Sequence, residues 1–107
     1  MSVALVWSDR AKRRMAEIGD FVAERDPAAA ARTIDSIFER VALLANHPQI
    51  GIVFPGSPTD NVRIMYFGRY RVYYLCELAE KRVTILTVRH GREASLSLDR
   101  ALDESES

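Results

Sequence analysis

Five side chains in the second half of the chain have the chemistry to bind an anion or to move a proton: Arg63, Arg71, Arg89, His90 and Arg92. Guanidinium groups bind phosphates or carboxylates through pairs of parallel hydrogen bonds. Histidine acts as a general acid or base near neutral pH. The same arginines also occur as solvated sheet residues in weak ion pairs, and a lone histidine at a strand end often serves only as a hydrogen-bonding group. The residue types therefore leave two interpretations open, a target-binding surface or an ordinary surface.

Metal and phosphate motifs are missing from the sequence. His47, His90 and Cys76 lack the spacing of a metal-binding set, and neither a Gly-rich phosphate loop nor a nucleophile elbow occurs. We therefore expect no metal and no cofactor. A single cysteine cannot form an internal disulfide, and Cys76 within an apolar run is expected to be a buried small hydrophobic residue.

The charge of the chain is balanced overall but unevenly placed. Its 107 residues have a formal net charge of zero, which argues against broad electrostatic binding to nucleic acid. The last nine residues hold four acids and one base, which leaves 14 bases and 11 acids in residues 1–98. We expect one domain over 1–98 and a frayed acidic tail over 99–107. The sequence has no signal segment and no membrane span, so we expect a cytoplasmic protein.

Apolar periodicity predicts a strand followed by a helical hairpin. Residues 3–7 are β-prone, and a helix begins at about Asp9 with apolar residues three and four positions apart. Asp26 and Pro27 are suited to begin a second helix, which we expect to run to about Asn46. The two apolar stripes predict that Ile18, Phe21, Ile34 and Phe38 share a core.

The second half of the chain predicts an antiparallel meander. A Gly- and Pro-rich loop over 49–60 precedes predicted strands at 61–67, 70–78 and 82–89, and a short helix is expected within 94–102. The fold class is α+β: an N-terminal strand, a two-helix hairpin packed on a mainly antiparallel sheet, and a short C-terminal helix. Alternation along the strands suggests that Arg63, Arg71 and Arg89, joined by Arg92, form one cationic patch on the side away from the helices.

Short motifs spread over residues 3–93 together resemble the ParE/RelE superfamily of toxins. Each motif alone is weak, but their order and spacing are fairly specific. They are Val6-Trp7-Ser8 with Ala11 and Ile18, Pro27-x-x-Ala30, Leu44-x-x-x-Pro48-x-x-Gly51, Val62-Arg63, Tyr70-Arg71-Val72-Tyr73-Tyr74, and Val83 to Glu93 with its closing His90-Gly91-Arg92-Glu93. That closing motif resembles the ParE branch more closely.

The resemblance implies the toxin of a type II toxin–antitoxin system and a partner that neutralises it. The implied antitoxin is a ParD-like or other ribbon-helix-helix protein that forms a hetero-oligomer with the toxin, and Phe21, Ile37 and Tyr73 are expected to contact it. Operator DNA would be bound only through the antitoxin, and no membrane partner is implied.

The resemblance leaves the cellular target open between two activities. ParE-like toxins poison DNA gyrase, and Arg63, Arg71, Arg89, Arg92 and His90 would then contact the target. RelE-like toxins cut messenger RNA in the ribosome, and His90, Arg71 and Arg92 would then be the catalytic set. The resemblance places Arg63, Arg71 and Arg92 at three of the basic positions of such toxins. Met65 stands where a second lysine is expected for RNA cleavage, and no tyrosine follows Tyr74. These departures favour gyrase. A non-toxic relative that only binds an antitoxin is a third interpretation.

Overall fold

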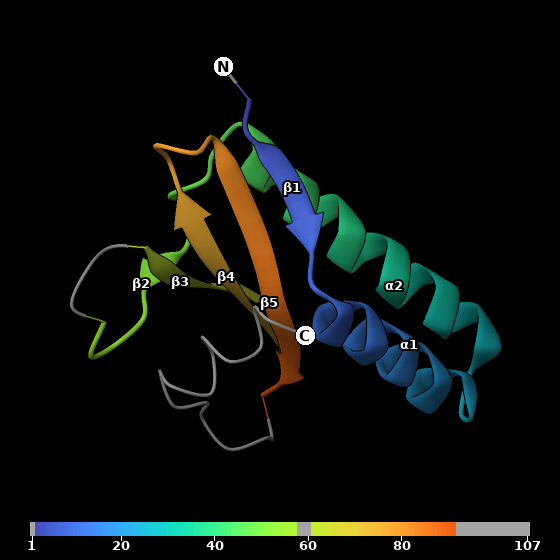
Figure 1. Cartoon of the computed structure of the whole chain (residues 1–107). Helices are drawn as coiled ribbons and strands as arrows, with labels where there is room; N and C mark the ends of the chain where they lie inside the picture. Colours follow the sequence, from blue (N-terminus) through green and yellow to red (C-terminus); the bar gives the residue numbers. More distant parts are fainter. Residues whose placement is uncertain (1, 58–60, 92–107) are drawn as a thin grey trace.

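A computed structural model of the chain describes residues 2–57 and 61–91 as two layers, a helical hairpin and a five-stranded sheet (Figure 1). The hairpin consists of α1 (Asp9–Ala23) and α2 (Pro27–Ala42), which cover one face of the sheet. The strands are β1 (Ala4–Trp7), β2 (Ile52–Val53), β3 (Val62–Phe67), β4 (Tyr70–Glu77) and β5 (Arg82–His90). This confirms the predicted α+β class. The expected helix within 94–102 lies outside the described residues.

Local capping chemistry sets the beginning of each helix. The Ser8 side chain accepts a hydrogen bond from the Ala11 amide at the start of α1, and Asp26 accepts one from Ala29 at the start of α2. Pro27 occupies the first turn of α2, where its missing N–H costs nothing. The second helix was predicted to reach Asn46. Its last turn tightens instead into the 3₁₀ helix η1 (Leu43–Ala45).

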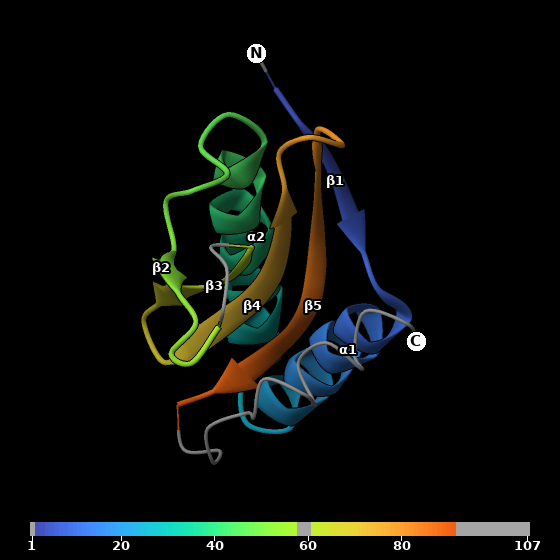
Figure 2. The ribbon, with the colours of Figure 1, turned by 60° about the vertical axis from the view of Figure 1, so that its left-hand side comes forward.

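The sheet order is β1-β5-β4-β3-β2. Strands β3, β4 and β5 form the predicted antiparallel meander. The partner of β1, which the sequence could not supply, is β5, and the two strands run parallel from the Ala4–Arg82 pair. The residues predicted as a loop include the short edge strand β2, which pairs antiparallel with β3 (Figure 2).

A β-bulge in β5 changes which side chains share a face. Tyr73 pairs with Thr87 and Tyr74 with Ile85, so Leu86 is an extra residue on β5. Simple alternation along β5 predicts that the side chains of Ile85 and Val88 lie on opposite faces of the sheet. The bulge instead brings both side chains into the core beneath the helices. Leu86 itself joins a second cluster on the other face.

The main core lies between the hairpin and the sheet. It includes Ile18 and Ile37, with Ile34 packed at its margin. The prediction that Phe21 and Phe38 belong to this core was wrong, because their side chains are 55% and 45% exposed. Phe21 lies near the tip of the hairpin, which reaches past the sheet (Figure 1). Phe38 lies on the flank of α2, where its ring is 5.0 Å from that of Trp7 on the edge strand β1.

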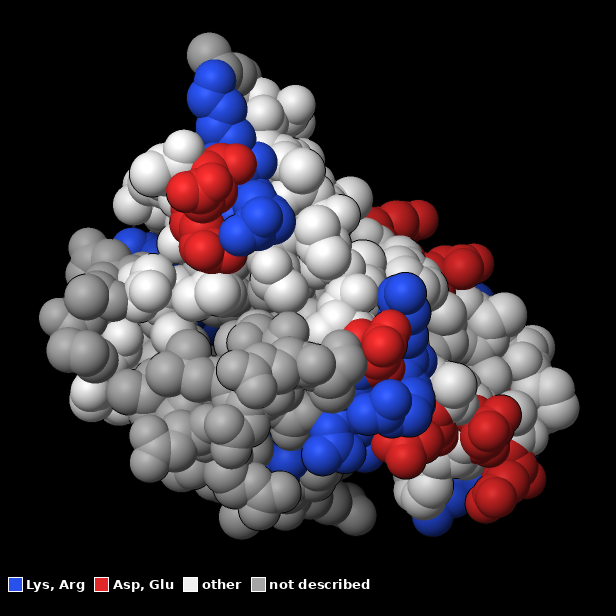
Figure 3. Space-filling view, in the orientation of Figure 1, with Lys and Arg blue, Asp and Glu red and all other residues white. Residues whose placement is uncertain are grey.

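The second core cluster lies on the opposite face of the sheet and contains Phe54, Val62, Ile64, Tyr73 and Leu86. On the molecular face drawn in Figure 3, acidic and basic side chains lie next to one another, in keeping with the zero net charge. Within the described part of the chain, no helix is long and apolar enough to span a membrane.

Candidate functional site

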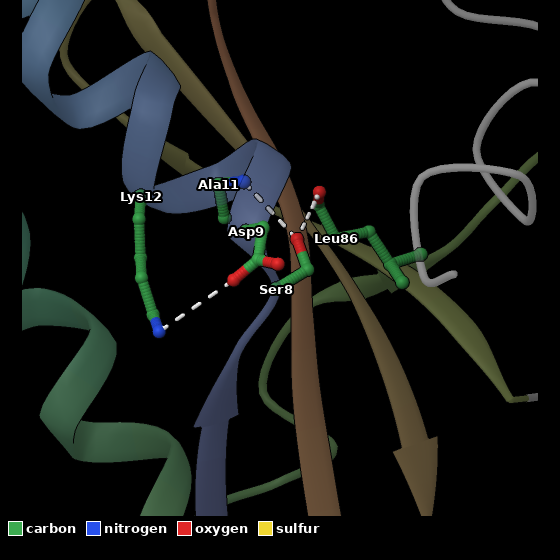
Figure 4. A network of polar contacts seen from close by, with 5 residues as sticks. All are labelled: Ser8, Asp9, Ala11, Lys12 and Leu86. Atoms are coloured by element: carbon green, nitrogen blue, oxygen red, sulfur yellow. Dashed lines mark hydrogen bonds and ion pairs between the residues drawn. The ribbon is translucent and has the colours of Figure 1, made fainter. Parts of the chain in front are cut away.

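Ser8 fixes the start of α1 against the middle of β5. Its amide donates a hydrogen bond to the Ile85 carbonyl at 3.0 Å. Its Oγ donates to the Leu86 carbonyl at 2.9 Å while accepting from the Ala11 amide at 3.0 Å (Figure 4). Ser8 is buried, so these bonds are shielded from water. The helix cap and the bulge are therefore one structural unit, and this unit aligns α1 with the second half of β5.

Farther along the same helix, α1 and the ends of the strands enclose a cavity of about 480 Å³. Its lining residues are Arg14, Glu17, Ile18, Phe21, Arg25, Arg69, Tyr70 and His90. The helical members share one face of α1, since residues three and four apart lie above one another. Arg69 comes from the β3–β4 turn, and His90 is the last residue of β5. A volume of this size lies in the range of small-molecule or side-chain sites.

Polar and ring contacts order several of the lining side chains. Arg14 donates from Nε to the Val88 carbonyl at 2.9 Å and pairs with Glu17 at 3.2 Å. The rings of Tyr70 and His90 meet edge to face, with 5.5 Å between their centroids. The Arg25 guanidinium lies 4.9 Å from the centre of the Phe21 ring, within range of a cation–π interaction.

Arg71 and Arg89 lie side by side on the face of the sheet away from the helices. They are cross-strand partners of β4 and β5, and they alternate with Val72 and Val88, which belong to the core beneath the helices. The Arg71 Nη2 donates to the His90 carbonyl at 3.3 Å. The His90 side chain lies on the opposite face, in the cavity. Arg92 lies outside the described residues.

Arg63 does not join this pair, so the predicted single patch of Arg63, Arg71 and Arg89 was wrong. It pairs with Tyr74 on the helix-facing side of the sheet and is only 9% exposed. Its Nη1 donates to the carbonyls of Gln49 and Gly51 at 3.1 and 2.7 Å. Arg63 and Met65 are two positions apart on β3, so their side chains lie on the same, helix-facing side of the sheet. Arg71 lies on the opposite side. Its role in the fold is to hold the loop before β2.

Residues 5–95 match the model described as the ParE toxin of the type II toxin–antitoxin system, parDE. The chain belongs to this family. It is 34% identical over 92 residues to Y4kP of Sinorhizobium fredii, a protein described as a candidate toxin, and the match covers 81% of this chain and 86% of that protein.

Solved toxins share the fold of this ParE-family chain at low sequence identity. The ParDE system of P. aeruginosa includes a chain with a TM-score of 0.68 and 21% identity, covering 83% of this chain and 96% of its own length. A chain of the RelBE2 toxin–antitoxin complex of Mycobacterium tuberculosis has a TM-score of 0.59 and 19% identity, covering 84% and 99%. An E. coli RelE variant in the free state has a TM-score of 0.64 and 15% identity, covering 99% and 96%.

The three residues expected to contact an antitoxin in this ParE-family toxin differ in exposure. Phe21 is exposed beside the cavity. Ile37 and Tyr73 are 0% and 1% exposed, so their side chains are parts of the two cores. Sequence reasoning missed Arg25, Arg69 and Tyr70 as lining residues. The signal was the spacing of positions 14, 18 and 21 along one face of α1, with Arg25 in the turn just after it. The facing strand ends come from distant parts of the sequence.

Burial raises the pKa values of two ionisable groups of this ParE-family toxin. Desolvation raises the pKa of Tyr74 above its ordinary value, although its hydrogen bond with the Gly51 amide and the nearby Arg63 charge oppose this. Desolvation also raises the pKa of the Cys76 thiol. A buried thiol with a raised pKa is a poor nucleophile, which agrees with the expected role of Cys76 as a packing residue.

Proposed function

We propose that this ParE-family toxin inhibits DNA gyrase and that a cognate antitoxin neutralises it. The observation that carries the choice of target is the position of Arg63. Cleavage of RNA by its own 2′-hydroxyl needs an acid, a base and cations around one phosphate. Arg63 stands at one of the basic positions expected for RNA cleavage, but it is buried and bonded to two loop carbonyls, so it is committed to the fold and is not proposed as a target contact. Met65, at the position expected for a second lysine, is also buried.

The positions of the other candidate catalytic residues support the same choice. Arg71 lies on the face of the sheet away from the helices, whereas the His90 side chain lies in the cavity on the helix side. Within residues 2–57 and 61–91, the acid–base candidate and the arginine pair therefore lie on different faces. We propose that Arg71 and Arg89, with Arg92, contact carboxylates or phosphates of the gyrase–DNA complex as paired cations.

The proposed partner is a ParD-like or other ribbon-helix-helix antitoxin that binds the toxin in a hetero-oligomer. The structures named ParDE and RelBE2 come from toxin–antitoxin systems and share this fold. The exposed Phe21 and Phe38 add apolar surface on the hairpin, which a partner would bury. We propose that operator DNA is bound through the antitoxin and not by the toxin itself.

Ribosome-dependent cleavage of messenger RNA is the second candidate, and His90 is the observation that favours it. Tyr70 packs edge to face on the His90 ring, and Arg71 binds the His90 carbonyl. The imidazole is thus held in place at the end of β5, as a general acid or base would need to be.

Two assays with the purified toxin test the proposal side by side. We expect trapped gyrase–DNA breaks and no codon-positioned cuts in ribosome-bound messenger. Replacing Arg71 and Arg89 with glutamate should abolish the breaks, while Arg32→Glu on α2 serves as an exposed charge control. Messenger cleavage that falls roughly a hundredfold in His90→Ala, with gyrase unaffected, would establish the nuclease instead. Inactivity in both assays would leave the non-toxic, antitoxin-binding interpretation.

A further inference from the structure

The cavity beneath α1 concentrates positive charge that the chain as a whole does not have. Three arginines and one glutamate line it, so its formal charge is +2 with His90 neutral, whereas the net charge of the chain is zero. Arg14 is paired with Glu17, which leaves Arg25 and Arg69 as the exposed cations, one in the turn after α1 and the other in the turn between β3 and β4. Phe21 and Tyr70 add aromatic surface. Guanidinium groups beside rings suit an acidic peptide with apolar residues among its carboxylates.

The sequence of this chain contains such a peptide. Residues 99–107 hold four carboxylates and one arginine, with Ala101 and Leu102 between them. The family match ends at residue 95, so this acidic segment lies beyond the part shared with ParE toxins. Its charge of −3 is opposite in sign to that of the cavity and equal in size to the +3 of residues 1–98.

The end of β5 lies at the cavity, within reach of the acidic segment. The Gly91 amide donates to the Arg69 carbonyl at 2.6 Å, so the backbone passes directly beside a lining residue. Seven residues separate that glycine from Asp99, and the eight Cα–Cα steps between them span at most about 29 Å when extended. The connection is therefore long enough for residues 99–107 to return to the cavity.

We propose that the acidic segment 99–107 binds in this cavity, with its carboxylates on the guanidinium groups of Arg25 and Arg69. The segment then acts as an intramolecular occupant that any acidic partner must displace. This proposal does not depend on whether the toxin acts on gyrase or on the ribosome.

A spin label at residue 107 of this chain tests the proposal. Ser107→Cys introduces a thiol for labelling, while burial protects Cys76. We expect the oxidised label to broaden the NMR amide signals of Phe21, Arg25 and Arg69 by at least half, relative to the reduced label. The broadening should weaken in 0.5 M NaCl, because salt screens exposed charges.

Matched charge reversals give the test its control. Arg25→Glu with Arg69→Glu should abolish the broadening, and Glu104→Arg with Glu106→Arg added to that pair should restore part of it. Arg13→Glu with Arg32→Glu changes the charge by the same amount at exposed residues outside the cavity and should have no such effect. Absent broadening, or broadening that survives Arg25→Glu with Arg69→Glu, would overturn the proposal. Absent broadening with signals that instead shift on adding inorganic phosphate would assign the cavity to a free anion.

Discussion

At the scale of single residues, Arg63 shows how a side chain with catalytic chemistry can serve the fold instead. A buried cation is costly unless hydrogen bonds satisfy it. Arg63 meets this need with the carbonyls of Gln49 and Gly51. The Gly51 amide in turn donates to the Tyr74 hydroxyl at 2.9 Å. Arginine, tyrosine and loop backbone thus form one buried polar network, which holds the segment before β2 against the sheet.

Replacing Gly51 with alanine should disrupt this network. An added Cβ would lie 2.7 Å from the Ile64 carbonyl oxygen and 2.8 Å from the Tyr74 hydroxyl. We expect a loss of roughly 1–3 kcal/mol in the free energy of unfolding, the usual cost of overpacking. Gly19→Ala is the matched control, because its Cβ would meet Ile34 only at 3.5 Å within α1. That variant should gain about 0.5–1 kcal/mol from helix propensity. Urea denaturation measures both, and equal stabilities would refute the packing argument.

The pKa values of Tyr74 and Cys76 predict a loss of stability at alkaline pH. Burial raises both above the ordinary values of 10.0 and 9.0. The folded protein therefore holds these protons more tightly than the unfolded chain, and unfolding becomes easier as pH rises. The stability that these two groups contribute is fully present at pH values below their pKa values in the unfolded chain. It is lost as pH rises through their higher pKa values in the folded protein. We expect the urea midpoint to fall between pH 9 and pH 11, and to fall less in Tyr74→Phe. A midpoint that stays constant to pH 11 would count against this.

At the scale of elements, the join between β1 and α1 depends on the bulge in β5. The extra residue Leu86 frees a carbonyl from the regular ladder, and the Ser8 hydroxyl donates to it. The same hydroxyl caps α1. A single buried side chain therefore connects the helix layer to the sheet and sets the position of the cavity wall.

Removing this hydroxyl should cost more than removing an ordinary helix cap. Ser8→Ala leaves both the Ala11 amide and the Leu86 carbonyl without their partner in a buried place. We expect a loss of about 2–4 kcal/mol, the sum of a cap and a buried hydrogen bond. Asp26→Ala removes the exposed cap of α2 and should cost about 1 kcal/mol. Thermal and urea unfolding of the two variants compare them, and similar losses would show that the bond to Leu86 adds nothing.

Most elements were predictable because their signals are local. Asp26-Pro27 indicates a helix start, Gly68 a turn, and the apolar stripes the buried faces. The parallel pairing of β1 with β5 was not predictable, since it joins distant segments through the backbone. The bulge at Leu86 reversed the apparent faces of Val88 and His90, because one extra residue shifts the period of two. The sequence did not predict the cavity for a related reason. The residues that line it from α1 follow a helical spacing, but the strand ends that face α1 come together only through long-range pairing.

At the scale of the whole molecule, this is a small domain that leaves large apolar side chains exposed. Phe21 and Phe38 are about half exposed on the hairpin. A domain of this size has a thin margin of stability. Exposed aromatic residues cost little in the free protein, but they are common anchors in interfaces. The exposed face of the hairpin is therefore a part of the surface on which a partner would stabilise the toxin.

Binding of the proposed antitoxin should therefore stabilise the toxin, and Phe21 should carry part of that effect. A partner that binds only the folded state adds about 4 kcal/mol when present at a thousand times its Kd. Phe21→Ala should weaken binding by roughly tenfold or more, as expected for an aromatic anchor. It should change the stability of the free toxin by less than about 0.5 kcal/mol, because the ring is exposed.

Leu78→Ala is the control, since this exposed residue follows β4 far along the chain from the hairpin. Calorimetric titration and melting curves measure the two effects. Equal melting temperatures with and without antitoxin would contradict the proposed partnership, whereas equal affinities of the two variants would remove Phe21 from the interface.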